Sequence, residues 1–181
     1  MNKVYYSWQD IEAQCQSIVN SIAREQWRPD YVVGITRGGN IPATIISHML
    51  DVRCEALKIA LRDNAECESN CWMAEDAFGY VDDPEYQARW DPDLRKKILV
   101  VDDINDTGET LKWLMRDWQS SCLPQQDYAW DRVWDNTVKF ATLVDNLGSD
   151  FKVSYTGTEV DKTKDSRWLV FPWECVGEYN D

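Results

Sequence analysis

The sequence has little of three things on which common classes of protein depend: histidine, basic charge and long apolar runs. Its 181 residues include one histidine, and 19 lysines and arginines face 32 aspartates and glutamates, a formal net charge of −13. Nucleic-acid binding needs a basic surface that releases counterions from phosphates, so this charge argues against a nucleic-acid partner. The chain has no run of about 20 apolar residues, and we therefore expect no membrane span and no membrane partner.

Other absences narrow the class further. The first residues, MNKVYYSW, do not have the charged and then apolar character of a signal sequence, so we expect a cytoplasmic protein. The six cysteines lie at spacings unlike those of a zinc knuckle, and we expect reduced thiols and no zinc. No internal repeat and no low-complexity tract is present, and the length suits one domain with a continuous core.

The most informative stretch runs from residue 97 to residue 111 and reads KILVVDDINDTGETL. Ile98 to Val101 have the unbroken aliphatic character of a strand that is buried on both faces. Asp102 and Asp103 therefore emerge where this strand ends. Two adjacent carboxylates in that position can accept the hydrogen bonds of a vicinal diol.

The residues that follow predict a turn and then a helix. Asn105 to Gly108 supply turn chemistry, and residues 109–118 continue with helical character. The first backbone N–H groups of such a helix have no partner within it and lie at the positive end of its dipole, where a phosphate binds without a lysine. A plain helix cap would not need Asp102, Asp103 and Asp106 together, because their mutual repulsion is costly unless cations or hydroxyls occupy the site.

A second strand, loop and helix predict another anion site. Residues 31–36, YVVGIT, form a short apolar run that leads into Arg37, Gly38 and Gly39 before Pro42 begins a helix through about residue 50. Paired glycines allow a close backbone approach, the guanidinium offers a fixed fork of donors to an oxyanion, and proline suits the first turn of a helix.

The stretch 97–111 resembles, residue for residue, the phosphoribosyl diphosphate (PRPP) motif of type I phosphoribosyltransferases. The resemblance implies that the acidic pair Asp102 and Asp103 binds the ribose hydroxyls. It implies that Asp106 lies close to the base nitrogen that is glycosylated and is the candidate general base. The residues it assigns to the 5-phosphate are Asn105, Asp106, Thr107, Gly108, Glu109 and Thr110.

The same family has a short loop after its first core strand that grips pyrophosphate. By resemblance, this loop consists here of Thr36, Arg37, Gly38 and Gly39. Members also cover the reacting centre with a mobile segment, which shields the cation-like sugar centre from water. Residues 62–70 are the expected flap, and Arg62 at its start is a further candidate ligand of pyrophosphate.

The C-terminal segment 167–174, RWLVFPWE, resembles the purine-binding segment of xanthine-guanine phosphoribosyltransferases. In that comparison Trp168 stacks on the purine and the backbone of Leu169 reads the base edge. Glu174 takes the place of an acid near the metal and the pyrophosphate. The resemblance therefore implies Mg²⁺, brought in with PRPP and held near Asp102, Asp103 and Glu174. Magnesium also explains how so acidic a chain binds a polyanionic substrate.

The chain departs from the family at the residue that is expected to contact the purine base. Enzymes for 6-oxopurines commonly have a lysine shortly after the strand that follows the PRPP helix, where it donates to the 6-oxygen. That position aligns with Asn146, and Lys152 is too far along the chain to replace the lysine. An asparagine amide can donate to an oxo group or accept from an amino group. Guanine, hypoxanthine and xanthine are the expected bases, and adenine stays open.

The expected fold is α/β, with a mostly parallel sheet flanked by helices, as in the type I phosphoribosyltransferase fold, and a small C-terminal hood. Ligand loops lie at the carboxyl ends of the strands of such sheets. An amphipathic N-terminal helix presents Ile11, Ile18 and Ile22 on one stripe. Expected strands are 31–36, 53–60, 97–102 and 138–144, with helices at 40–50 and 108–119. We expect a single domain over residues 1–181, with a core over about 1–150, insertions at about 63–95 and 120–136, and the hood over about 151–181.

The expected function is transfer of 5-phosphoribosyl from PRPP to a purine base with release of pyrophosphate, in nucleotide salvage. The family implies a homodimer. Two alternatives stay open: a regulator on the same fold that senses PRPP or a nucleotide without catalysis, and a transferase for adenine or a pyrimidine base.

Overall fold

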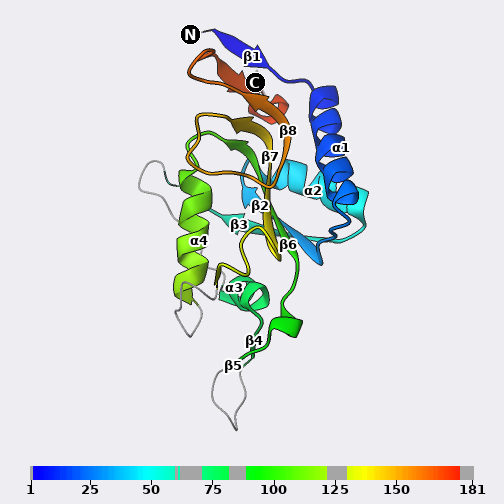
Figure 1. Cartoon of the computed structure of the whole chain (residues 1–181). Coiled ribbons are helices and arrows are strands. Elements are labelled where there is room, and N and C mark those ends of the chain that lie inside the picture. Colours follow the sequence, from blue (N-terminus) through cyan, green and yellow to red (C-terminus); the bar gives the residue numbers. More distant parts are fainter. Residues whose placement is uncertain (1, 60, 62–70, 82–88, 122–129, 176–181) are drawn as a thin grey trace, which may run out of the picture.

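Five parallel strands form the central sheet of the computed structural model, which describes residues 2–59, 61, 71–81, 89–121 and 130–175 (Figure 1). The expected flap 62–70 and its Arg62 lie outside the described residues. Every neighbouring pair of strands is parallel. The predicted α/β class with a mostly parallel sheet is confirmed. The strand order is β3 (Arg53–Lys58), β2 (Tyr31–Thr36), β6 (Ile98–Asn105), β7 (Val138–Asn146) and β8 (Tyr155–Val160).

Helices cover both faces of this sheet, and the strands supply apolar side chains to each face. Along β6, Ile98 and Val100 join one buried cluster, whereas Leu99 and Val101 join the other. Side chains alternate along a strand, so a run of aliphatic residues serves both faces at once. The first cluster packs against α3 (Cys71–Phe78) and α4 (Glu109–Ser121), and the second packs against α1 (Trp8–Arg24) and α2 (Asn40–Leu50).

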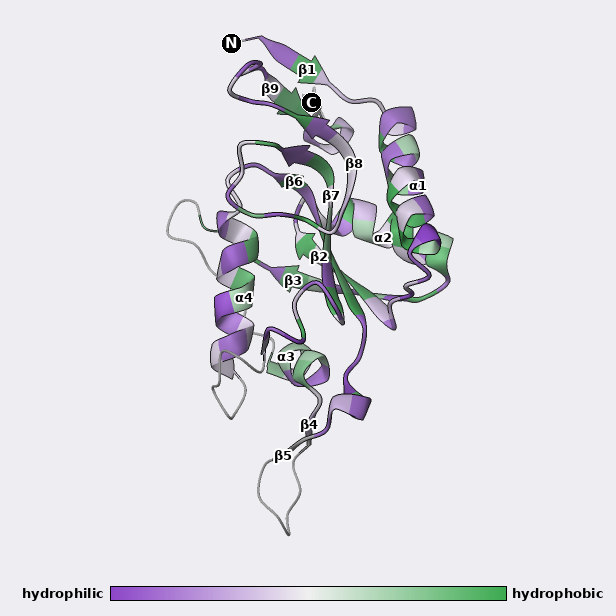
Figure 2. Cartoon of the chain, viewed as in Figure 1, coloured by the Kyte–Doolittle hydropathy of each residue, from purple (hydrophilic) through white to green (hydrophobic). Residues whose placement is uncertain are grey.

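The N-terminal helix begins with a capping box. The hydroxyl of Ser7 accepts from the Asp10 amide at 3.2 Å, and the Asp10 carboxylate accepts from the Ser7 amide at 2.7 Å. These contacts satisfy backbone donors that the first turn leaves without helical partners. Ile11, Ile18 and Ile22 lie on the buried face, as the sequence pattern predicts. Figure 2 shows hydrophilic residues on the outer side of this helix and hydrophobic residues along the central strands.

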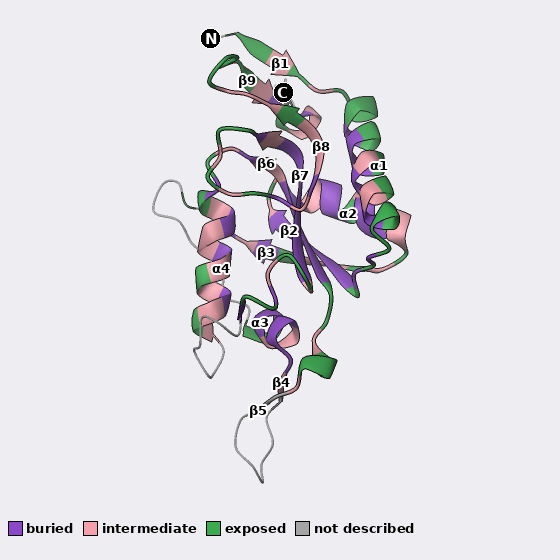
Figure 3. Ribbon diagram, viewed as in Figure 1, coloured by how far each residue is buried: buried purple, intermediate pink, exposed green. Residues whose placement is uncertain are grey.

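The described parts of the two predicted insertions extend the core. In the first, α3 buries Met73 and Phe78, and the short strands β4 (Tyr80–Val81) and β5 (Arg89–Trp90) and the 3-10 turn η1 (Pro92–Leu94) follow it. In the second, Trp130 is fully buried, with its ring 5.1 Å from those of Phe78 and Trp134. Both segments therefore contribute large apolar side chains to the cluster that includes residues of α4. Figure 3 shows α3 as a largely buried helix.

The hood combines both ends of the described chain. Strand β1 (Lys3–Tyr5) pairs in parallel with β9 (Trp168–Val170), and η2 (Pro172–Cys175) follows. Figure 1 shows this small sheet above the carboxyl ends of β6 and β7. The structure differs from the predicted boundary, because β8 lies within residues 151–181 yet hydrogen-bonds to β7 in the central sheet. We therefore place the hood boundary after β8 and include β1 in the hood.

None of the helices in the described ranges is both long enough and apolar enough to cross a membrane.

A buried ammonium joins the last turn of α1 to the sheet. Lys139 on β7 has a side chain that is 8 % exposed, and it pairs with Glu25, which caps the C-terminus of α1. The hydroxyl of Tyr155 on β8 donates to the same carboxylate. These hydrogen bonds from Lys139 and Tyr155 lower the pKa of Glu25. The carboxylate is therefore held in its charged form by partners on two neighbouring strands.

We predict that Glu25→Ala lowers the free energy of unfolding by about 1–3 kcal/mol at neutral pH, because Lys139 is left buried without an anion. The lower end of the usual range applies since half of the Glu25 side chain is open to water. The lowered pKa means that Glu25 stabilises the fold above its ordinary pKa of about 4.3, and that this stabilisation is lost as the pH falls through the folded value. Denaturant unfolding at pH 7 and at pH 3 measures both effects.

The matched variant is Lys139→Met, which removes the buried charge and keeps an apolar side chain of similar length. It should lower the free energy of unfolding less than Glu25→Ala does, because the carboxylate left behind is half exposed. An equal loss in both variants, or no loss in Glu25→Ala, would contradict the assignment.

Candidate active site

Two adjacent carboxylates lie near the carboxyl end of the central strand β6, which continues past them to Asn105 instead of ending at residue 102 as predicted. Asp102 is buried, and its carboxylate accepts a 2.9 Å hydrogen bond from the backbone N–H of Asp103. Burial, together with the neighbouring Asp103 charge, raises the pKa of Asp102 well above its usual value. Burial likewise raises the pKa of Asp103 to about 6. Two such groups favour hydroxyl donors or a cation as neighbours, because either offsets the cost of the buried charge.

The Gly38–Gly39 loop packs directly on these carboxylates. A Cβ atom on Gly38 would lie 1.8 Å from Oδ2 of Asp103. One on Gly39 would lie 2.5 Å from the carbonyl oxygen of Val101 and 2.7 Å from the Cα of Asp102. Only glycine allows this approach. The loop after β2, predicted to bind pyrophosphate, therefore lies beside the pair predicted to bind ribose. The Thr36–Arg37 peptide bond in this loop is cis, and Arg37 is exposed.

The turn after β6 is held from behind by a buried asparagine. The amide of Asn105 donates to the Asp145 carboxylate at 2.7 Å and to the carbonyl oxygen of Phe151 at 2.8 Å. Its oxygen accepts from the Ser149 hydroxyl at 3.0 Å. Since these contacts use both amide donors, the Asn105 side chain supports the turn, and the contact of Asn105 with the 5-phosphate stays a prediction.

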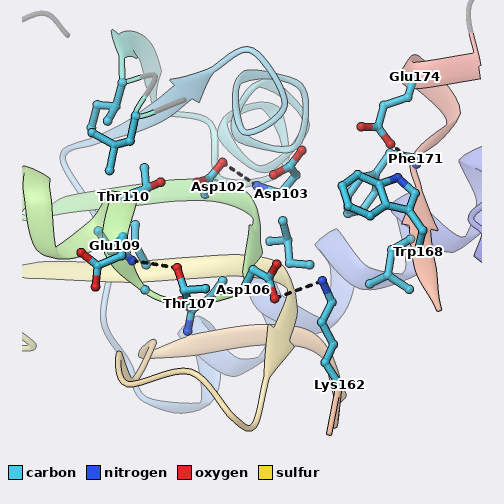
Figure 4. A pocket seen from close by; sticks show the side chains of 17 residues that line it. Asp102, Asp103, Asp106, Thr107, Glu109, Thr110, Lys162, Trp168, Phe171 and Glu174 are labelled. Atoms are coloured by element: carbon cyan, nitrogen blue, oxygen red, sulfur yellow. Dashed lines mark hydrogen bonds and ion pairs between the residues drawn. The ribbon is translucent and has the colours of Figure 1, made fainter. Parts of the chain in front are cut away.

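The same turn leads directly into the N-terminus of α4. Gly108 has φ of +85°, and a Cβ atom there would lie 2.4 Å from the Cβ of Phe151. The Thr107 hydroxyl accepts from the Glu109 amide at 3.5 Å, a long contact that caps the first turn loosely (Figure 4). The first-turn amides and the threonine hydroxyls thus stand at the positive end of the helix dipole, where a phosphate is stabilised.

A cavity of about 650 Å³ lies over these groups and is closed on the far side by the hood. This volume is typical of small-molecule sites. Thr36, Arg37, Gly38, Gly39 and Asn146 are not among its lining residues, although Gly38 touches Asp103. The predicted site residues that line the cavity are Asp102, Asp103, Asn105, Asp106, Thr107, Gly108, Glu109, Thr110, Trp168, Leu169 and Glu174.

The hood supplies an aromatic wall. Figure 4 shows the Trp168 ring across the cavity from the carboxylates of β6, with Glu174 next to it. The Trp168 side chain stays 43 % exposed, although its backbone N–H donates to the carbonyl oxygen of Asn2 at 3.0 Å. The Glu174 carboxylate accepts from the Phe171 amide at 2.8 Å, and its charge contributes, after burial, to the raised pKa of Asp103. An open indole on a fixed strand is suited to stacking on a flat heterocycle.

Asn146, predicted to read the base, is not among the residues that line the cavity, and its side chain is hydrogen-bonded to protein groups. It is buried, and its amide nitrogen donates to the carbonyl oxygen of Asp106 at 2.9 Å and to Oδ1 of Asp106 at 3.4 Å. Its side-chain oxygen accepts from the backbone N–H groups of Gly148 and Lys162 at 3.2 Å and 3.1 Å. The side chain therefore ties the turn after β6 to the segment after β8.

Lys162 is a cavity residue that the sequence analysis did not find. Its ammonium lies 3.0 Å from Oδ1 of Asp106 (Figure 4). The sequence signal is faint, because Lys162 and Lys164 stand on either side of Thr163 and nothing local says which of them turns inward. The cavity thus contains a cation next to the candidate base.

Magnesium fits this site only with ligands from outside the chain. Among the described residues, no group of three acidic, histidine or cysteine side chains is arranged to hold a metal ion. Mg²⁺ commonly takes one or two carboxylates and completes its shell with water and substrate phosphates. Asp102, which is buried, and Asp103, which is half-buried, offer such carboxylates, and Glu174 stands across the cavity from them.

Comparison with known proteins agrees with this architecture. The chain is 29% identical over 153 residues to the xanthine-guanine phosphoribosyltransferase of Cereibacter sphaeroides, covering 84% of this chain and 72% of that protein. It is 25% identical over 194 residues to xanthine phosphoribosyltransferase 1 of Saccharomyces cerevisiae, covering 96% and 90%. The solved structure of a xanthine-guanine-hypoxanthine phosphoribosyltransferase from Helicobacter pylori superposes with a TM-score of 0.64 at 19% identity, covering 96% of this chain and 95% of that one.

The family model described as the phosphoribosyl transferase domain matches residues 1–178. This range includes the strand and turn with the acidic pair, the glycine loop beside it and the hood strand with Trp168. The predicted family resemblance and its fold are confirmed, and the chain belongs to the phosphoribosyltransferase family of glycosyltransferase-class enzymes.

Proposed function

We propose that this protein transfers the 5-phosphoribosyl group of PRPP to a purine base and releases pyrophosphate, with Mg²⁺, as a step of nucleotide salvage. The observation that carries the proposal is the single cavity in which the acidic pair, the N-terminus of α4 and the Trp168 indole face one another. A ribose phosphate needs the first two groups, and a flat base needs the third. The names of three curated relatives, which are xanthine, hypoxanthine-guanine and xanthine-guanine phosphoribosyltransferases, support the choice of base.

The sugar phosphate binds along the path from β6 to α4. Asp102 and Asp103 accept hydrogen bonds from the two ribose hydroxyls, which relieves the desolvation that raises their pKa values. The 5-phosphate lies at the first turn of α4, with Thr107 and Thr110 offering hydroxyl donors. The loop at Gly38 and Gly39 approaches from the other side, beside the leaving pyrophosphate. The site thereby holds the sugar at both ends.

The reaction replaces one bond to the anomeric carbon by another. The C1–O bond to pyrophosphate breaks with its electron pair, and a lone pair of a purine ring nitrogen forms the new C1–N bond. Asp106 accepts the imidazole N–H proton of the base as positive charge develops there. Trp168 stacks on the base and fixes its plane toward C1. Most of the rate enhancement comes from positioning these groups and stabilising charge.

Magnesium, when bound with PRPP, neutralises pyrophosphate charge and makes it a better leaving group. Asp102 and Asp103 are the carboxylates we propose as its protein ligands, with Glu174 near the outgoing pyrophosphate. The proposal also includes a homodimer that works in the cytoplasm, both taken from the family.

The direct test measures pyrophosphate release from PRPP and Mg²⁺ with guanine, hypoxanthine, xanthine, adenine, orotate and uracil added singly. We expect release with one or more of the three 6-oxopurines. Release with a pyrimidine alone would assign the other class of transferase. PRPP binding without release for any base would overturn the enzyme and favour a sensor.

We predict that Asp106→Asn lowers kcat at least about tenfold while PRPP still binds, because the amide cannot accept a proton as the carboxylate does. Steady-state turnover and calorimetric PRPP binding measure the two effects. Asp150→Asn is the matched control, since that side chain is 86% exposed and pairs only loosely with Lys112 at 3.6 Å. Unchanged turnover in Asp106→Asn would remove Asp106 from its role.

We predict that Gly38→Ala weakens PRPP binding at least about tenfold, because the new methyl group would overlap the Asp103 carboxylate and displace it from the ribose hydroxyls. Gly148→Ala is the control, since its Cβ would meet its nearest neighbours at 3.6 Å, an ordinary contact. Calorimetry with PRPP compares the two variants. Equal affinity in Gly38→Ala and the unmodified protein would show that Asp103 does not contact the sugar.

A further inference from the structure

A lysine and a carboxylate form a donor and acceptor pair inside the cavity. The Lys162 ammonium lies 3.0 Å from Oδ1 of Asp106, and both residues line the cavity. Asn146 also donates to Oδ1, and within the described ranges Oδ2 of Asp106 takes part in no hydrogen bond or ion pair. An ammonium has three donors, and a carboxylate has two oxygens. The pair can therefore stay intact while a free N–H of Lys162 and the free oxygen of Asp106 face a ligand.

The placement of Lys162 is built into the fold. Its backbone N–H donates to the side-chain oxygen of Asn146 at 3.1 Å, while the amide nitrogen of Asn146 holds Asp106. One buried side chain thus sets the positions of both members of the pair. The next lysine turns away: Lys164 is 83% exposed, and its ammonium lies 2.8 Å from Oδ2 of Asp161.

The ion pair contributes little to the stability of the fold. The side chains of Lys162 and Asp106 are 23% and 36% exposed, and pairs open to water in this way stabilise proteins weakly. A cation held at that place by a buried asparagine is better explained by what it contacts in the cavity. Lys162 can also be replaced without threatening the fold.

The chemistry of a purine edge matches this pair. In the proposed reaction N9 must present its lone pair to the sugar, so the imidazole proton of the free base is on N7. The substituent on C6 is the neighbour of N7 along the same edge. With Asp106 at the N7 proton, Lys162 faces the C6 substituent. Since an ammonium has donors and no acceptor, it is satisfied by an oxo group and is left facing other donors by an amino group.

We propose that Lys162, presented from the segment after β8, is the residue that selects 6-oxopurines over 6-aminopurines, and that Asn146 is its positioning residue. This inference rests on the proposed function for the orientation of the base. It resolves the ambiguity at Asn146: the side chain at the aligned position reads no base and instead holds the lysine that does. The selecting cation thus stands at a different sequence position from the lysine of the family, and the tertiary structure places it beside Asp106.

The test compares Lys162→Met with the unmodified enzyme, using hypoxanthine and adenine as bases. Methionine keeps the length of the side chain and removes the donors. We expect kcat/KM for hypoxanthine to fall about 10- to 100-fold, as for loss of a charge-assisted hydrogen bond, while the value for adenine does not fall. Lys164→Met, on the same segment, should leave both values unchanged. An unaltered ratio of hypoxanthine to adenine in Lys162→Met would overturn the inference.

Binding of the product nucleotides separates this inference from the proposed function. Inosine and adenosine 5′-monophosphate differ in the C6 substituent and in the proton on the adjacent N1, and calorimetry measures their affinities without any turnover. We expect the unmodified protein to prefer the inosine nucleotide and Lys162→Met to lose that preference. If this holds while no base supports pyrophosphate release, the transferase fails and Lys162 remains the selecting residue. If Lys162→Met keeps the preference, or the unmodified protein has none, Lys162 is not the selector.

The role of Asn146 is tested with Asn146→Ala, by measuring the ratio of kcat/KM for hypoxanthine to kcat/KM for adenine. A residue that only supports the fold would lower activity for both bases together. A residue that positions Lys162 lowers the activity with hypoxanthine more than the activity with adenine. A parallel loss for both bases would limit Asn146 to supporting Asp106.

Discussion

Two neighbouring carboxylates near the carboxyl end of the central strand, one buried and one half-buried, are the constraint on which the rest of this structure depends. Asp102 and Asp103 are placed there because β6 lies between β2 and β7, so its carboxyl end opens into the middle of one edge of the sheet. Burial raises the pKa values of both groups, a cost that the fold alone does not recover. The loop at Gly38 packs against them so closely that no side chain fits between. The arrangement makes physical sense once hydroxyls or a cation fill the space.

Two buried asparagines hold the loops that follow the strands beside these carboxylates in place. Asn105 joins the turn after β6 to the segment near Phe151, and Asn146 joins the same turn to the segment at Lys162. The amide nitrogen of each donates to protein groups. Buried amides whose hydrogen bonds are satisfied rigidify their surroundings, and here they fix the groups that face the cavity.

The sheet was predictable because its strands carry their signal locally. Residues 98–101 are aliphatic without interruption and residues 31–36 are mostly apolar, and each strand serves two buried clusters at once. The hood was predicted less well. Whether β8 joins the central sheet, and whether β1 pairs with β9, depends on hydrogen bonds between segments far apart in the chain. The structure of the predicted insertions was equally hard to predict. The packing of Trp130 against Phe78 joins the two segments, and neither segment alone has a sequence pattern that indicates it.

The sequence by itself determined the half of the site that we propose for the sugar phosphate, because the acidic pair, the turn and the start of α4 follow one another closely, and local geometry places neighbouring residues. Tertiary structure decided the half that we propose for the base. Asn146 stands at the position where a base-reading group was predicted, yet its contacts turn it toward Asp106 and the backbone of Lys162. Which of two nearby lysines reaches the cavity depends on how the segment after β8 folds back on the turn after β6. That contact joins distant residues, and no local pattern encodes it.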